Sequence, residues 1–215
     1  MSNLNIKNKI QKNNTVYTPE KLSYFIYKKI TKDYNFKTIY DPCIGKGGMT
    51  KYFFENDNYK VIGSDIENVG QNYCHEFYNQ DIKNLNINIK PDCVIMNVPF
   101  NGNGRGKNLL FPHLFLKTIF DKFGEDMPVV MITGDNFLNN NSLNSKRLKY
   151  ISDGSFKITS ITTLPLNVFE GIKFNAQVLY FNMDKLQPYD IFDISKVQIP
   201  LTPSNNTTNP NTKVA

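Results

Sequence analysis

The stretch TIYDPCIGKGG, residues 38–48, decides the fold of this chain. Its β-branched and aromatic start predicts a short strand that ends at Asp41, and a glycine-rich turn follows. Glycines let the backbone pass close to a ligand, and the N-terminus of the helix expected next favours negative charge. A dinucleotide fingerprint would need glycine at position 50 after Gly45 and Gly47, where Thr50 stands, and there is no P-loop Gly-Lys-Ser/Thr. The pattern therefore predicts a ligand-binding turn and disfavours NAD and ATP.

The segment before this strand predicts a helix. Thr18 followed by Pro19 is typical of an N-cap and a proline at the first helical position. Leu22, Phe25, Ile26 and Ile30 then fall on one face, which predicts an amphipathic helix to about residue 32.

The remaining chain alternates between strand-like and helix-like segments. Two late strands have no helix-length segment between them, so we expect them to pair as an antiparallel hairpin. The sequence therefore predicts an α/β, Rossmann-like fold with a mostly parallel seven-stranded sheet and a C-terminal antiparallel hairpin. The expected strands after the first are 61–65, 93–96, 128–133, 158–164 and 177–181, and the expected helices are 49–55, 110–123 and 143–151.

The 215 residues suit a single domain with tails. We expect a catalytic or binding domain over residues 15–184. A flexible basic arm (1–14) precedes it, and a short C-terminal extension (185–200) follows it. The last segment, 201–215, is rich in Pro, Asn and Thr and predicts a disordered tail.

Composition narrows the class of protein. The net charge of +6 fits a polyanionic partner such as nucleic acid. The three cysteines share no metal-ligand spacing, and with two histidines this predicts no metal site and reduced thiols. No apolar run approaches the roughly 18 residues of a membrane span, and the N-terminus has no secretory pattern. These features predict a cytoplasmic protein, in a bacterium or a phage-infected host, without a membrane partner.

The candidate site residues follow the strands. Ligands of such sheets bind beyond the carboxyl ends of the strands. Asp65 ends the second strand, 24 residues after Asp41, and suits hydrogen bonds from ribose hydroxyls. Asp81 follows after a helix-sized interval and is a candidate end of the third strand. The fourth strand runs into Asn97-Val98-Pro99-Phe100, and a Gly/Asn-rich loop with Arg105 and Lys107 comes next.

At these residues the chain resembles a known family. Asn97-Val98-Pro99-Phe100 resembles the Asn-Pro-Pro-Tyr/Phe motif of S-adenosylmethionine-dependent N6-adenine DNA methyltransferases. Three other segments resemble motifs of this family, in the order of its gamma-type members and over about residues 15–184. They are Tyr17-Thr18-Pro19, residues 41–48, and residues 164–169 with the strand 177–181 that follows; this last motif also occurs in modification subunits of type I restriction systems.

The resemblance implies a class I methyltransferase fold and S-adenosylmethionine as the cofactor. Thr18 and Pro19 are expected to line its methionine end, with Tyr17 beside them. The remaining expected cofactor contacts are Asp41, Gly45 and Gly47 at the amino-acid portion, Asp65 at the ribose and Asp81 at the adenine amino group.

The resemblance also implies how the target base is held. Asn97 would accept a hydrogen bond from the adenine N6 amine through its side-chain oxygen, and the Val98 carbonyl would accept the other proton. Two acceptors on these protons aim the nitrogen lone pair at the sulfonium methyl, so that transfer is a direct displacement. The base must be flipped out of the duplex. The expected substrate contacts are Pro99 and stacking Phe100 in the motif, Phe169 as a pocket wall, and Arg105 and Lys107 at phosphates.

Two departures from the family leave alternatives open. Valine stands at position 98 where the family has proline, which loosens the backbone that carries the acceptor. Only about thirty residues follow the late motif, where the family has a target-recognition domain, so DNA recognition falls to small loops or to a specificity or restriction subunit. The alternatives are methylation of an RNA adenine or a protein glutamine, and a nucleic-acid-binding subunit with weak or no turnover. The glycine turn and the strand-end acids also allow a purely structural interpretation.

Overall fold

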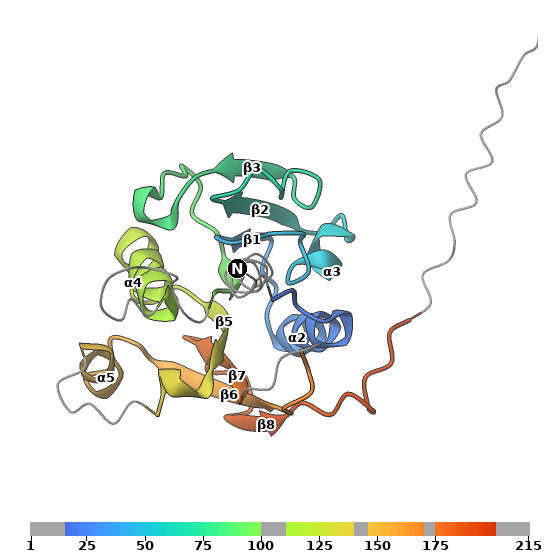
Figure 1. Ribbon diagram of the computed structural model, residues 1–215, viewed down its shortest axis with the longest axis vertical. Coiled ribbons are helices and arrows are strands. Elements are labelled where there is room, and N and C mark those ends of the chain that lie inside the picture. Colours follow the sequence, from blue (N-terminus) through green and yellow to red (C-terminus); the bar gives the residue numbers. More distant parts are fainter. Residues whose placement is uncertain (1–15, 100–110, 140–145, 170–174, 201–215) are drawn as a thin grey trace, which may run out of the picture.

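The computed structural model describes residues 16–99, 111–139, 146–169 and 175–200. Within these residues, eight strands form one sheet in the order β3-β2-β1-β4-β5-β7-β6-β8 (Figure 1). Strands β1 to β5 pair in parallel, whereas β7 is antiparallel to both of its neighbours. The strands are β1 (Thr38–Asp41), β2 (Lys60–Asp65), β3 (Glu76–Asn79), β4 (Cys93–Asn97), β5 (Val129–Gly134), β6 (Ile158–Leu164), β7 (Ala176–Phe181) and β8 (Tyr189–Ile191).

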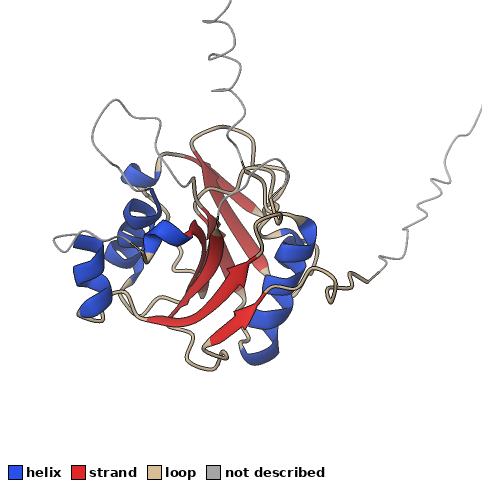
Figure 2. Cartoon of the chain, turned by 60° about the horizontal axis from the view of Figure 1, so that its bottom comes forward, coloured by secondary structure: helices blue, strands red, loops and turns tan. Residues whose placement is uncertain are grey.

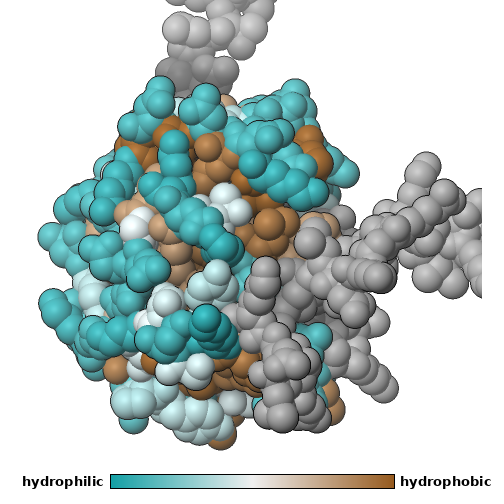
Figure 3. Space-filling view, turned by 90° about the vertical axis from the view of Figure 1, so that its left-hand side faces the viewer, coloured by the Kyte–Doolittle hydropathy of each residue, from teal (hydrophilic) through white to brown (hydrophobic). Residues whose placement is uncertain are grey.

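Helices cover both faces of the sheet (Figure 2). One face carries α2 and α3, and the other carries α4 and α5, as Figure 1 shows. The surface on the side of α4 and α5 is largely hydrophilic, with smaller apolar areas between the polar side chains (Figure 3). The helices are α2 (Glu20–Asp33), α3 (Lys51–Phe54), α4 (Phe111–Phe123) and α5 (Lys146–Ser152), with short 3-10 turns η1 (Ile82–Asn84) and η2 (Asp135–Phe137).

Two apolar layers hold these elements together. Leu22, Ile26 and Ile30 of α2 are fully buried against one face of the sheet. On the opposite face, Leu116 and Ile119 of α4 are equally buried. Burial of each such side chain contributes about 1.5–3 kcal/mol to stability, so the apolar spacing in each helix fixes which face it turns to the sheet.

These elements confirm most of the expected architecture, including the parallel sheet and the β6–β7 hairpin. The sheet has one strand more than the seven expected, because residues 189–191 pair in parallel with β6. The segment that contains β8 also supplies core side chains: Leu186 is 5% exposed and Phe192 is 1% exposed. Residues 185–200 therefore add an edge strand and core contacts.

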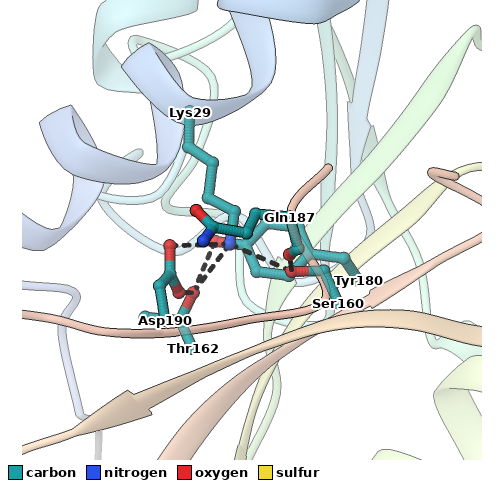
Figure 4. Close-up of polar contacts among 6 residues, drawn as sticks. All are labelled: Lys29, Ser160, Thr162, Tyr180, Gln187 and Asp190. Atoms are coloured by element: carbon teal, nitrogen blue, oxygen red, sulfur yellow. Dashed lines mark hydrogen bonds and ion pairs between the residues drawn. The ribbon is translucent and has the colours of Figure 1, made fainter. Parts of the chain in front are cut away.

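A partly buried polar cluster connects β8 to α2 (Figure 4). The Lys29 Nζ atom donates hydrogen bonds to Ser160 Oγ at 3.0 Å, Thr162 Oγ1 at 3.1 Å and Asp190 Oδ2 at 2.9 Å. It also lies 4.3 Å from the ring centroid of Tyr180. Burial lowers the pKa of Lys29, and Asp190 opposes this shift. The ammonium group is thus paired with a carboxylate and two hydroxyls, as a buried charge requires.

Three local expectations were wrong. Pro19 is the N-cap of α2, and Thr18 makes no capping bond, because its hydroxyl contacts other residues described below. The helix expected over 49–55 is only Lys51–Phe54. Asp81 does not end a strand: β3 ends at Asn79, and the interval between β2 and β3 consists of turns and bends without a helix.

Candidate functional site at the carboxyl edge of the sheet

Three polar residues lie where parallel strands end. Asp41 is the last residue of β1, Asp65 of β2 and Asn97 of β4. Strands β2, β1 and β4 are adjacent and parallel, so these residues share one edge of the sheet. This is the edge where open α/β sheets bind their ligands.

The glycine turn after β1 is built for close approach. Gly45 and Gly47 have φ of +50° and +69°, a region that other residues rarely adopt. A Cβ atom on Gly47 would lie 2.5 Å from the Tyr73 Cβ atom, so no side chain fits there. The Gly45 amide donates a 2.9 Å hydrogen bond to Asp65 Oδ2, which ties the turn to the end of β2.

Asp41 lies beneath this turn rather than at the surface. The residue is 1% exposed, and its Oδ1 atom accepts a 3.0 Å hydrogen bond from the Cys43 amide. Burial raises the pKa of Asp41 to about 7, and the nearby negative charge of Asp65 adds to the shift. Asp41 thus orders the turn and concentrates acidic potential under it, while Asp65 accepts a further 3.0 Å bond from the Glu67 amide.

Asn97 is held at both its side chain and its main chain. Its Nδ2 atom donates to Val16 O at 3.0 Å and to Thr18 Oγ1 at 3.1 Å. Its carbonyl oxygen accepts a 3.5 Å hydrogen bond from the Cys43 thiol. Both amide protons are therefore used within the protein, and the other end of the side chain, Oδ1, is turned away from these two acceptors.

The segment before α2 crosses the glycine turn. A Cβ atom on Gly45 would lie 3.9 Å from Tyr17 Cε1, and one on Gly48 would lie 3.2 Å from the Thr18 carbonyl oxygen. The Lys46 Nζ atom lies 5.1 Å from the ring centroid of half-exposed Tyr17. The structure thus brings together the first, second and third of the sequence motifs: residues 17–19, the glycine turn and the end of β4.

The late motif lies on the same face of the sheet as the Asn97 side chain. Phe169 is 4% exposed and packs in the α2-side core with Val168 and Leu164. Ile95, two residues before Asn97 on β4, belongs to the same core. Residues two apart on a strand point to the same face, so Phe169 and Asn97 share the α2 side.

Other expected site residues lie elsewhere or outside the described residues. Val98 is 1% exposed and packs on the α4 side, and Pro99 is exposed. Asp81 caps η1 by accepting a 3.0 Å bond from the Lys83 amide, beyond the end of β3. The segments outside the described residues include Phe100, Arg105 and Lys107, together with the basic arm 1–14 and the tail 201–215.

Sequence reasoning missed two contacts of Asn97. Cys43 was expected only to be one of three reduced thiols, yet its thiol contacts the Asn97 carbonyl, and burial raises its pKa well above the ordinary value. Its place beside Asp41 in the turn was the available signal. Val16 contacts Asn97 through its main-chain oxygen, and the identity of a side chain does not predict such a contact.

Among the described residues, His, Cys, Asp and Glu form no group of three or more that could hold a metal ion. None of the helices in the same residues has the length and apolarity needed to cross a bilayer.

Comparisons with known proteins place the fold. No protein-family model and no curated protein matches the sequence. Among solved structures, the methyltransferase subunit of the type I restriction-modification system from Streptococcus thermophilus superposes with a TM-score of 0.63 at 15% identity, over 82% of this chain and 47% of that one. The modification subunit of a proposed type I restriction enzyme from Vibrio vulnificus gives 0.59 at 17% identity, over 82% and 46%.

A third structure is shorter. A proposed class I S-adenosylmethionine-dependent methyltransferase from Listeria monocytogenes superposes with a TM-score of 0.61 at 14% identity, over 85% of this chain and 68% of that one. The chain spans about half the length of the two type I subunits. These superpositions and the strand order of the sheet lead to one conclusion: this protein has the fold of the class I methyltransferases.

Proposed function

We propose that this protein transfers a methyl group from S-adenosylmethionine to the N6 amine of a flipped adenine in DNA. The observation that carries the proposal is the fixed amide of Asn97, at the end of β4 and beside a glycine turn. The similarity of the fold to modification subunits of type I restriction systems supports DNA as the substrate.

The residues present fit S-adenosylmethionine. At Gly45 an added Cβ atom would meet only Tyr17 Cε1, at 3.9 Å, so the backbone of the turn is open to a ligand at this position. Asp65 places a carboxylate beside the turn, which suits a ligand that carries an ammonium and a sulfonium. Residues 17–19 and 45–48 would hold the methionine end, Asp65 the ribose and Asp81 the adenine amino group. When bound, the cofactor supplies an electrophilic methyl group.

The chain's own contribution is orientation. An exocyclic amine has its lone pair delocalised into the ring and is a poor nucleophile. Asn97 Oδ1 accepts one of its protons and the Val98 carbonyl accepts the other, which favours a tetrahedral nitrogen aimed at the methyl carbon. No covalent enzyme intermediate is required. Phe100, Pro99 and Phe169 would enclose the base, and Arg105 and Lys107 would meet phosphates.

Incubation with radiolabelled S-adenosylmethionine and adenine-containing DNA tests the proposal. We expect label in N6-methyladenine, and we expect Asn97→Ala to abolish transfer while S-adenosylmethionine binding stays nearly unchanged. Absence of transfer by a protein that binds the cofactor normally would refute a DNA adenine substrate. Parallel assays with RNA and with a glutamine-containing protein substrate identify the two other amine acceptors.

A second candidate is a nucleic-acid-binding subunit with little turnover that works with a specificity or restriction subunit. Val98, in place of the family's proline, favours it. In that case Val98→Pro gains transferase activity, or the wild type fails to bind S-adenosylmethionine in calorimetry. Unchanged or lower activity of Val98→Pro in an active protein would dismiss this candidate.

A further inference from the structure

The contacts of Thr18 differ from those of a simple cofactor-lining residue. Its hydroxyl donates toward Met49 Sδ, at 3.8 Å, and accepts a 3.1 Å hydrogen bond from Asn97 Nδ2. The hydroxyl proton is therefore directed at the sulfur, and the oxygen is left as an acceptor for the amide. Two hydrogen bonds thus run in the same direction, from Asn97 Nδ2 to Thr18 Oγ1 and from the Thr18 hydroxyl to Met49 Sδ. Met49 lies just after the glycine turn.

The second anchor makes the direction of the amide unambiguous. Val16 O lies 3.0 Å from Asn97 Nδ2, and a main-chain carbonyl can only accept a hydrogen bond. Rotation of the amide by 180° would place Oδ1 against this carbonyl, two acceptors face to face, and the Thr18 hydroxyl would have to turn away from Met49 Sδ to donate to Oδ1. Both anchors therefore hold Asn97 with Oδ1 on the side away from residues 16–18.

At the start of α2, the Thr18 hydroxyl contacts Asn97 and Met49 instead of capping the helix. Threonine is a favourable N-cap, yet the cap is Pro19, and no side chain caps the helix. Such a departure from a local rule is expected at a functional site. The Thr18 main chain is also close to the turn, where a Cβ on Gly48 would lie 3.2 Å from the Thr18 carbonyl oxygen.

We propose that Thr18 is a positioning residue: with Val16, it fixes the Asn97 amide so that Oδ1 faces the amine of the substrate, and it couples this orientation to the turn that holds the cofactor. The inference rests on the proposed function and adds a role to the one that the sequence motif implies. A residue that only lines the cofactor would affect cofactor binding. A residue that orients Asn97 would affect the methyl-transfer step.

Steady-state kinetics of three variants separate these roles. Thr18→Val removes the acceptor and keeps the shape, so we expect kcat to fall roughly 10- to 100-fold, as a misdirected reacting group does. The KM for S-adenosylmethionine should stay within about twofold, because the amide and not the cofactor loses its contact. Thr18→Ser keeps the hydroxyl and should restore most of kcat. The matched control is Thr50→Val, at a buried threonine whose Oγ1 atom has no hydrogen-bond partner among the described residues, and its kcat should equal that of the wild type.

A measurement without turnover keeps this inference separate from the proposed function. In spectra of the ¹⁵N-asparagine-labelled protein, the side-chain NH₂ signal of Asn97, assigned with Asn97→Ala, should be protected from exchange in the wild type and in Thr18→Ser but less so in Thr18→Val. If the wild type methylates nothing while the amide shows this pattern, the proposed function fails and the positioning by Thr18 stands. A Thr18→Val protein with normal kcat, a raised KM for the cofactor, or an unchanged Asn97 amide would overturn the inference.

Discussion

The buried carboxyl of Asp41 makes a prediction about stability that does not depend on any substrate. Burial raises its pKa from an ordinary 3.8 to about 7 in the folded state. The folded protein therefore binds more protons than the unfolded chain between these two pH values, and the free energy of unfolding must fall as the pH rises through this range. The full contribution is present below about pH 4 and is lost by about pH 7.

The magnitude follows from the shift. About three pKa units at 1.36 kcal/mol each give about 4 kcal/mol as the upper value for the stability lost at this residue between pH 4 and pH 7. Asp41→Asn keeps the acceptor for the Cys43 amide and removes the charge. We expect the variant to equal the wild type in stability near pH 4 or to be slightly weaker, and to exceed it by about 2–4 kcal/mol at pH 8.

Urea unfolding of both proteins at half-unit steps from pH 4 to pH 8 measures this difference. A wild-type-to-variant difference that stays constant with pH would refute the reasoning, because it would show that Asp41 carries the same charge in both states. Loss of S-adenosylmethionine affinity in the stabilised variant would agree with an acidic turn retained for binding at the expense of stability.

Three other perturbations test the elements that support the site. Gly47→Ala should lower stability by at least about 1 kcal/mol, because alanine is strained at this φ and its Cβ would collide with Tyr73; thermal unfolding against a Gly154→Ala control at an open positive-φ position separates the clash from the strain. Asp190→Asn should lower the free energy of unfolding by about 3 kcal/mol, because the Lys29 ammonium loses its carboxylate. In a double-mutant cycle, the Lys29→Met/Asp190→Leu pair should lower it much less, and additive losses would contradict a coupled pair. Phe192→Ala should cost about 3–5 kcal/mol in urea unfolding, and a loss below 1 kcal/mol would show that residues 185–200 are dispensable to the core.

Much of the fold could be predicted because its elements are local and strongly patterned. The buried strand 93–97 ends at a polar Asn, and the α4 segment repeats its apolar residues at helical spacing. β8 could not be predicted in this way, since Tyr189 and Ile191 are exposed and the strand exists only through its pairing with β6 and the ion pair of Asp190. Tertiary contacts, rather than propensity, define such an edge strand.

In the candidate site, too, some residues could be predicted from local sequence and others depend on tertiary contacts. The glycine turn and the polar end of β4 could be located because strand ends and glycines leave a trace in the sequence. The sequence also indicated Thr18, but as a helix cap, because a cap is the commonest use of threonine before a helix. Its bond to Asn97 spans 79 positions, and the Val16 carbonyl contact spans 81, so neither could be read from local spacing.

Helix α2 connects the Asn97 site, at its N-terminus, with the polar cluster around Lys29. The helix starts directly after the Pro19 cap, beside Thr18, which holds Asn97. About 16 Å further along its axis, Lys29 on the third turn donates hydrogen bonds to β6 and β8. Along the way, Lys21 donates to the Ile194 carbonyl and Phe25 meets Phe192 edge to face. A protein cut after residue 184 would therefore leave α2 without these supports, and the disturbance would reach the amide at the far end without any change in the motifs themselves.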